Sequence, residues 1–391
     1  MKKIIVLLWA MILTVSAIAQ QAESVRSFIE ESHDSLWYVR QMEAWNKVVE
    51  QEPANENAWR NLFEAAYGLT STFSMQQGDT CVKTVLQRMK TAIPDTYAYY
   101  ICAYRACPGP RNEFAEKAIK LLPDSLSDSG YDAVLGYLWM MGDADGEGQR
   151  TALFNEILNR QYVAGKYPSF ILRFGYNQLQ GMDKGGIFFG NGDMELFDKI
   201  LLQRALHVHT DKVIVVMPFL MVANYRDALC KRLGIPLFQW PQIHSETDRD
   251  KAISDMVDYI IKQTGRSAYF SPSARQVIPG LMNKLYNDGL VFKYSESPYD
   301  NIASAMRHVE QDYHFDYLSE PAFQVEKWWT GSENLQLNYV VMLAHLVEAY
   351  RETGRQQQAD RLYDILKASV ENGGFSEAKK KEYLGYLDQW K

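Results

Sequence analysis

The residues with the clearest potential for chemistry are the turn Asn191-Gly192-Asp193 and Glu195, which follows two positions after the turn. A short apolar run, residues 187–189, precedes the turn and a stretch of helical period follows it, so the turn is predicted to join a strand to a helix. Open α/β sheets bind their ligands outside the carboxyl ends of parallel strands. We therefore predict a ligand crevice lined by Asn191, Gly192, Asp193 and Glu195.

Asp193 has two interpretations, which are compatible with each other. It is either a ligand-binding carboxylate or the N-cap of the following helix, with Asn191 and Gly192 supplying the turn. A catalytic pair of Asp193 and Glu195 requires environments that separate their pKa values. Residues two apart at a helix start do not face each other. No catalytic residue is therefore assigned, and an enzyme that uses this pair is kept as the alternative.

Neither a cofactor nor a metal is predicted. Gly190 and Gly192 begin a dinucleotide-binding pattern, but the third glycine is replaced by Glu195, whose charge would repel a pyrophosphate. His207 and His209 form an H-x-H pair at a predicted helix C-terminus, and the sequence offers no third ligand for them.

The serines of the stretch FSPSARQ are predicted to be structural. Ser271 and Ser273 follow an apolar run, but no G-x-S-x-G motif surrounds either of them. Ser273 is therefore predicted to cap a helix rather than to act as a nucleophile.

Short apolar runs that alternate with stretches of helical period predict the sheet that positions the turn. Such alternation is typical of a parallel sheet covered on both faces. Residues 166–318 are thus predicted to form a small Rossmann-like domain with a mostly parallel sheet. Its four predicted strands are Ile187-Phe188-Phe189, Val213-Ile214-Val215-Val216, Ala268-Tyr269-Phe270 and Leu290-Val291-Phe292.

Helical repeats are predicted on both sides of this domain, at residues 20–165 and 319–391. Amphipathic runs in the first region stop at Pro53, Pro94 and Pro123, and their residue pattern resembles degenerate tetratricopeptide repeats. In the second region the pattern is carried by Leu346, Tyr350, Gly354, Ala359 and Tyr363. The predicted fold class is therefore α/β plus all-α.

The first 19 residues predict a secretory signal peptide. Two lysines precede an apolar run, and Ala17 and Ala19 fit a cleavage site after Ala19. The run is too short to span a bilayer, and no later stretch is long and uncharged enough to do so. We expect a periplasmic or secreted protein without a transmembrane segment in its mature chain.

Composition and charge exclude some partners. The chain of 391 residues is 47% hydrophobic and 23% charged, as in ordinary globular proteins. Its net charge of −7 gives no basic surface for nucleic acid. Cys102 and Cys107 could pair, or the cysteines could be buried thiols; the pairing of all four, Cys81, Cys102, Cys107 and Cys230, stays open.

Residues 167–370 resemble a known family. The stretch GGIFFGNGDMELF, followed by DKVIVVMPFLMVANYRDAL, is similar to the soluble C-terminal region of bacterial membrane proteins of the protein O-mannosyltransferase-like family (DUF2723, the transmembrane protein 260 type). Asn191, Gly192 and Asp193 match the family's turn, and Glu195 stands where the family has aspartate. Tyr225 stands at an aromatic position of the family, so the resemblance adds it to the ligand-binding residues.

The resemblance also implies a difference in function. Glycosyl transfer is expected in the family's multi-pass membrane portion, which this chain lacks, and a shared fold does not transfer that activity. The sequence therefore predicts an exported, non-catalytic binding protein linked to cell-envelope glycan or glycoprotein processes. Its partner would be a protein or a glycan-related ligand. The alternative is an extracytoplasmic glycan-acting enzyme that uses Asp193 and Glu195.

Overall fold

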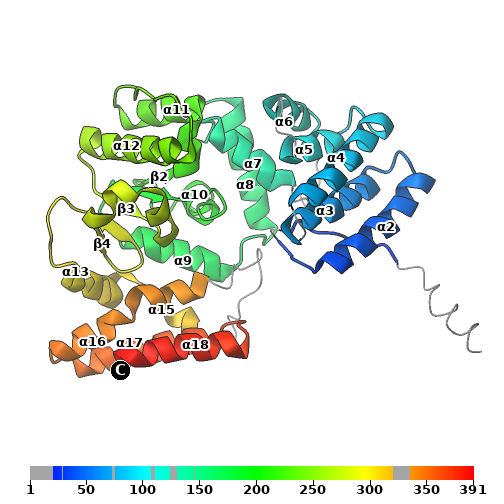
Figure 1. Ribbon diagram of the computed structural model, residues 1–391. Helices are drawn as coiled ribbons and strands as arrows, with labels where there is room; N and C mark the ends of the chain where they lie inside the picture. Colours follow the sequence, from blue (N-terminus) through cyan, green and yellow to red (C-terminus); the bar gives the residue numbers. More distant parts are fainter. Residues whose placement is uncertain are drawn as a thin grey trace, which may run out of the picture. The chain divides into compact units, whose positions relative to one another are not determined.

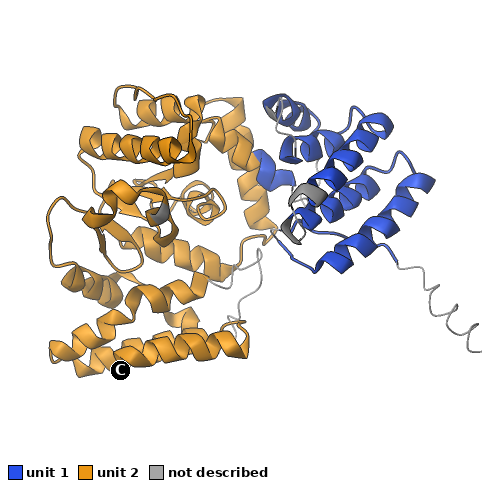
Figure 2. Cartoon of the chain, viewed as in Figure 1, with its two compact units in different colours: residues 1–134 blue, residues 135–391 orange. Residues whose placement is uncertain are grey.

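The computed structural model describes residues 21–28, 30–72, 75–106, 111–123, 130–144, 146–319 and 335–391 (Figure 1). Helices account for 66% of the structure, and the described part contains one small mixed sheet. The chain divides into two compact units, residues 1–134 and 135–391 (Figure 2). The boundary falls within helix α7, Gly130–Met140, whereas the predicted division into residues 20–165, 166–318 and 319–391 stays a prediction.

Some predictions concern residues outside this description. The signal peptide, residues 1–19, and Cys107 both lie there, so the Cys102–Cys107 pairing does as well. Cys81 and Cys230 are free thiols, and burial raises the pKa of the Cys230 thiol. In the part of the chain that the structure describes, no helix combines the length and apolar character needed to cross a bilayer.

Unit 1 consists of helices that pack on their neighbours in the chain, α2 on α3, α3 on α4 and α5 on α6. Asp34 caps the first of them by accepting a hydrogen bond from the Trp37 N–H at 2.8 Å. Two helices end two residues before Pro53 and Pro94, as the restriction that proline places on the preceding residue requires. The helices are α2 Ser35–Gln51, α3 Glu56–Thr72, α4 Met75–Ala92, α5 Tyr97–Ala106 and α6 Arg111–Lys120.

A buried ion pair joins α3 to α5. The two terminal guanidinium nitrogens of Arg105, Nη1 and Nη2, donate to the carboxylate of Glu64, and the guanidinium lies over the rings of Phe63 and Tyr67. Burial lowers the pKa of Arg105, but the carboxylate of Glu64 raises it by more, so the net change is upward and the charge is retained.

The sheet of unit 2 is small and mixed, which agrees with the predicted α/β class. Its strand order is β2-β1-β3-β5-β4, in which β2, β1 and β3 pair in parallel and β5 runs antiparallel to both of its neighbours, β3 and β4. The change of direction follows from the short connection between β4 and β5, since only antiparallel neighbours can be joined by a tight turn. The strands are β1 Ile187–Gly190, β2 Val213–Val216, β3 Ala268–Phe270, β4 Leu285–Asn287 and β5 Phe292–Tyr294.

Helices cover both faces of the sheet. Figure 1 shows α11 and α12 on one side of the strands and α9 and α10 on the other. Every residue of β1, β2 and β3 is buried, as expected for strands covered on both faces. The helices in this part of unit 2 are α8 Gln149–Val163, α9 Ser169–Gln180, α10 Phe197–Arg204, α11 Ala223–Leu233 and α12 Glu246–Thr264, with the short 3-10 helices η1 Met217–Met221, η2 Pro272–Val277 and η3 Pro279–Lys284.

The rest of unit 2 is helical. α16 and α17 form an antiparallel pair whose turn contains Gly354 at φ +73°, a conformation that favours glycine. Leu346, Tyr350 and Ala359 are buried, as the repeat pattern predicts. The elements are α13 Asn301–Arg307, the π-helix η4 His308–Asp312, α14 Asp316–Ser319, α15 Leu337–Leu343, α16 His345–Glu352, α17 Gln356–Glu371, α18 Glu377–Leu387 and the 3-10 helix η7 Asp388–Trp390.

A second buried ion pair fixes α10 between α9 and β1. The Lys199 ammonium lies 3.1 Å from both carboxylate oxygens of Asp198 and from the carbonyl oxygen of Glu195. It also lies over the rings of Phe174 and Phe188. Burial raises the pKa of Asp198, and the charge of Lys199 opposes this rise. The two side chains are almost fully buried, at 1% and 3% exposure, so each charge depends on the other.

Replacement of Lys199 by Met should lower the free energy of unfolding by about 3–5 kcal/mol, because it leaves a buried carboxylate without its counter-charge. The matched control is Lys251→Met, which removes an exposed lysine paired with Asp255 on α12. Exposed pairs contribute at most about 1 kcal/mol. Urea unfolding of the two variants measures the difference, and similar losses in both would contradict the assigned role of Lys199.

Candidate functional site

The predicted turn lies at the carboxyl ends of β1 and β3, where Glu195 links the two strands. One carboxylate oxygen of Glu195 accepts hydrogen bonds from the Asn191 N–H at 3.0 Å and from the Ser273 hydroxyl at 2.8 Å. Asn191 directly follows β1, and Ser273 lies three residues after β3. The turn thus has the location expected from the sequence, and the Glu195 carboxylate is engaged by the protein itself.

Ser271, and not Ser273, caps the 3-10 helix η2, so this part of the sequence prediction was wrong. The Ser271 hydroxyl accepts a hydrogen bond from the Ala274 N–H at 3.3 Å and lies 3.1 Å from the Ser273 hydroxyl. Ser271 follows β3 directly, so it is the residue that precedes the helix. Ser273 is free to donate to Glu195 because the cap is supplied elsewhere.

Asp193 is not the side-chain cap of α10. The helix begins at Phe197, and the residue in its N-cap position is Leu196, which makes no side-chain cap bond. The carbonyl oxygen of Asp193 accepts hydrogen bonds from the N–H groups of Leu196 and Phe197, and its carboxylate accepts one from the Met194 N–H at 2.9 Å. The other carboxylate oxygen faces Gly136 on α7, where an added Cβ would lie 2.7 Å from it. Asp193 therefore directs its side chain toward α7.

The remaining two predicted site residues differ in accessibility. Tyr225 on α11 is 1% exposed, and its hydroxyl oxygen accepts a hydrogen bond from the N–H of Val216 at the end of β2. Its ring packs edge-on against Phe219. Gly192 has open space around its Cα, with no heavy atom within 4 Å of an added Cβ. Tyr225 is thus part of the core beside β2, while Gly192 remains open to a ligand.

The position of Asp193 can be tested through Gly136. Gly136→Ala should destabilise the protein by about 1 kcal/mol, because the new methyl group displaces the Asp193 carboxylate. In the Asp193→Ala background the same change should stabilise by roughly 0.5–1 kcal/mol, since alanine is favoured over glycine within a helix. A double-mutant cycle by urea unfolding gives the coupling, and additive effects would show that the two residues do not touch.

His207 and His209 do not form a metal site with other described residues, where no cluster of three His, Cys, Asp or Glu side chains occurs. Both have positive φ, 55° and 54°, in the connection after α10. The His209 ring lies 4.9 Å from the ring of Tyr176, and its buried Nε2 atom forms no hydrogen bond with any described residue. Burial, together with the charge of Lys212, lowers the pKa of His209 to about 4.

The lowered pKa of His209 predicts a loss of stability in acid. Between its unfolded value near 6.5 and its folded value of about 4, the unfolded chain binds more protons than the native protein. The free energy of unfolding therefore decreases as the pH falls through this window. His209→Asn should remove about 1–2 kcal/mol of this decrease, because asparagine does not titrate and tolerates positive φ.

The matched control is His207→Asn, which replaces an exposed histidine with the same backbone conformation. Urea unfolding at a series of pH values between about 7 and 4 compares the two variants. The prediction fails if His209→Asn keeps the pH dependence of the wild type.

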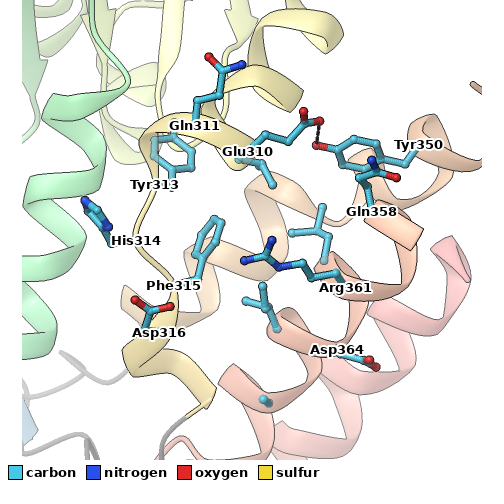
Figure 3. Close-up of a pocket in the computed structure, with 14 residues that line it drawn as sticks. Glu310, Gln311, Tyr313, His314, Phe315, Asp316, Tyr350, Gln358, Arg361 and Asp364 are labelled. Atoms are coloured by element: carbon cyan, nitrogen blue, oxygen red, sulfur yellow. Dashed lines mark hydrogen bonds between the residues drawn. The ribbon is translucent and has the colours of Figure 1, made fainter. Parts of the chain in front are cut away.

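A cavity of about 920 Å³ lies away from the predicted turn, between residues 309–316 and helices α16 and α17 (Figure 3). Its walls combine the buried side chains of Phe315 and Leu362 with polar groups that include Gln311 and Gln358. The volume falls within the range of small-molecule sites. No local sequence pattern indicates this cavity, because its walls come from separate segments of the chain.

The charged groups of the cavity differ in how they are paired. The Glu310 carboxylate accepts hydrogen bonds from the Tyr350 hydroxyl at 2.8 Å and from Arg355 at 2.5 Å. The Arg361 side chain is exposed, and its guanidinium points toward Phe315 across the cavity (Figure 3). Among the described residues, none forms a hydrogen bond or ion pair with Arg361. It is therefore the cationic group of the cavity that is available to an anionic ligand, in a lining that also contains Asp316 and Asp364.

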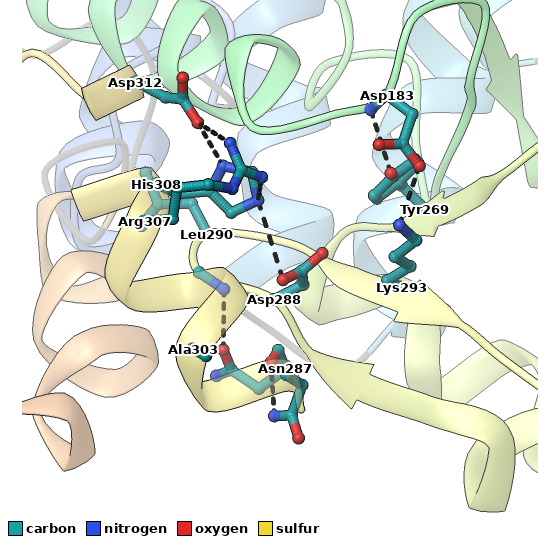
Figure 4. Close-up of polar contacts among 12 residues, drawn as sticks. Asp183, Tyr269, Asn287, Asp288, Leu290, Lys293, Ala303, Arg307, His308 and Asp312 are labelled. Atoms are coloured by element: carbon teal, nitrogen blue, oxygen red, sulfur yellow. Dashed lines mark hydrogen bonds and ion pairs between the residues drawn. The ribbon is translucent and has the colours of Figure 1, made fainter. Parts of the chain in front are cut away.

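A polar network anchors one wall of the cavity to the sheet (Figure 4). His308 Nδ1 lies 2.6 Å from the Asp312 carboxylate, and His308 Nε2 lies 3.8 Å from Asp288 in the turn between β4 and β5. The Tyr313 hydroxyl oxygen accepts a hydrogen bond from the Leu290 N–H at 3.0 Å in the same turn. This wall is therefore held by buried contacts on both sides of His308.

Comparison with protein-family models, with curated proteins and with solved structures finds no match to this chain.

Proposed function

We propose that the protein is an exported, non-catalytic binding protein whose ligand occupies the cavity between residues 309–316 and helices α16 and α17. The observation that carries the proposal is the Arg361 guanidinium, which lies in this cavity without a partner among the described residues. The proposal also includes three finer points. The helices of both flanking regions are tetratricopeptide-like repeats, the parallel part of the sheet is Rossmann-like, and the chain is related to the protein O-mannosyltransferase-like family. Export rests on the signal pattern of residues 1–19.

The chemistry of the cavity favours a glycan-related ligand that carries a carboxylate. A guanidinium group offers a planar set of donors that matches a carboxylate with two parallel hydrogen bonds. The apolar sides of a sugar ring can rest on the wall formed by Phe315 and Leu362, while the amides of Gln311 and Gln358 can bond its hydroxyl groups. Since Glu310 is already paired with Arg355, it does not repel such a ligand as a free carboxylate would.

The contacts of the turn favour binding over catalysis. A general base needs an accessible lone pair within reach of its substrate. One oxygen of Glu195 is occupied by Asn191 and Ser273, and Asp193 directs its carboxylate toward Gly136. The carboxylates of Asp193 and Glu195 thus contact different parts of the protein, which does not favour a shared catalytic role. The crevice at Gly192 stays part of the proposal as a secondary contact region for a ligand, and Tyr225 would support it from the core.

The test is thermal unfolding of the protein with a uronic acid oligosaccharide, the corresponding neutral oligosaccharide and a short acidic peptide. A ligand that binds only the native state at about 100 times its Kd stabilises it by about 2.7 kcal/mol, which raises Tm by several degrees. We expect this rise with the uronic acid oligosaccharide. It should be absent with the neutral one and in Arg361→Gln.

The matched control is Lys251→Gln, which removes one positive charge from an exposed position on α12 and should keep the full rise in Tm. An equal rise in Arg361→Gln would contradict the cavity as the site. A rise with the acidic peptide alone would transfer the site to a protein partner. Turnover of the oligosaccharide that is lost in Glu195→Gln would establish the enzyme alternative instead.

A further inference from the structure

An extended stretch of unit 1, residues 23–27, lies across helices α2, α3 and α5. From Ser24 to Ser27 its side chains alternate between exposed and buried: Val25 and Ser27 are 6% and 4% exposed, whereas Ser24 and Arg26 are exposed, as is Glu23 before them. This period of two is typical of an extended peptide with one face against a surface. The stretch therefore contacts the helices in the manner of a peptide ligand.

The helices hold this stretch mainly through its backbone. The Glu23 N–H donates to the side-chain oxygen of Gln41 at 2.9 Å, and the Glu23 carbonyl oxygen accepts from the indole N–H of Trp45 at 2.8 Å. The Val25 N–H donates to the side-chain oxygen of Asn61 at 2.7 Å. Because these bonds reach backbone groups, any non-proline residue at the two positions can form them.

Two side chains of the stretch are recognised individually. Ser27 accepts a hydrogen bond from Arg105 at 3.2 Å, and the bond to Glu64 holds Arg105 in place. Val25 belongs to a cluster of buried residues, whose other members are Tyr38, Ala65 and Leu69. The surface thus selects a β-branched apolar residue followed, two positions later, by a small hydroxyl residue.

We propose that this groove, formed by Gln41, Trp45, Asn61 and Arg105, binds an extended peptide of a partner protein, and that residues 23–27 are its resident competitor. The partner peptide carries valine or isoleucine two positions before serine or threonine. Exchange replaces each backbone hydrogen bond by an equivalent one. It is therefore governed by the affinity of the partner relative to the effective concentration of the tethered stretch.

The probe is the labelled peptide QAESVRSF, which copies residues 21–28, titrated into the full chain by fluorescence anisotropy. The wild type should bind it weakly, because its own stretch competes. Val25→Ala should raise the affinity for the peptide about tenfold, since the resident stretch loses buried apolar carbon atoms. Arg26→Ala, which changes an exposed side chain of the same stretch, is the matched control and should leave the affinity unchanged.

A substitution in the groove itself distinguishes binding in the groove from binding elsewhere on the protein. In the Val25→Ala background, where the resident stretch competes less, Asn61→Ala removes the acceptor for the peptide backbone and should lower the affinity about tenfold, with circular dichroism to verify folding. Two results would overturn the proposal. One is the absence of saturable binding to a folded Val25→Ala variant. The other is a Val25→Ala dimer in sedimentation that excludes the peptide, because the groove would then hold a second copy of this chain.

Discussion

The ammonium group of Lys199 is the constraint on which the centre of unit 2 depends. A buried cation must be both paired and hydrogen-bonded, and each contact of Lys199 fixes a different part of the fold. The carboxylate of Asp198 keeps the pair within α10, and the carbonyl of Glu195 holds the preceding turn against the helix. The rings of Phe174 on α9 and Phe188 on β1 both contact the Lys199 ammonium, so this group joins the helix to the strand.

The parallel part of the sheet could be predicted because its signal is local. Strands buried on both faces need continuous apolar runs, and the runs at residues 187–189, 213–216 and 268–270 became β1, β2 and β3. The antiparallel part could not be predicted in the same way. Strand β4, Leu285–Asn287, has only one buried residue and contains no apolar run, and of the predicted Leu290-Val291-Phe292 only Phe292 belongs to β5. Its pairing depends on the turn and on long-range contacts rather than on its own composition.

The candidate site was predictable in its location but not in its contacts. The position of Asn191 and Glu195 after β1 follows from the order of strand, turn and helix. The bond between Glu195 and Ser273 joins residues 78 positions apart, so no local pattern contains it. The cavity around Arg361 presents the same difficulty, since its walls come from residues 309–316 and from helices α16 and α17.

In unit 2, Glu195 already has protein hydrogen-bond partners, whereas Arg361 has none among the described residues. This difference decides which of the two groups binds a ligand at the lower cost. A carboxylate that already accepts two hydrogen bonds would have to give them up to bind a ligand, and the groups left behind would lose their partners at a cost of about 1–3 kcal/mol each. A guanidinium without a protein partner loses only its water when a carboxylate replaces it. Since affinity depends on this difference, the cavity around Arg361 is the more favourable place for an anionic ligand than the turn after β1.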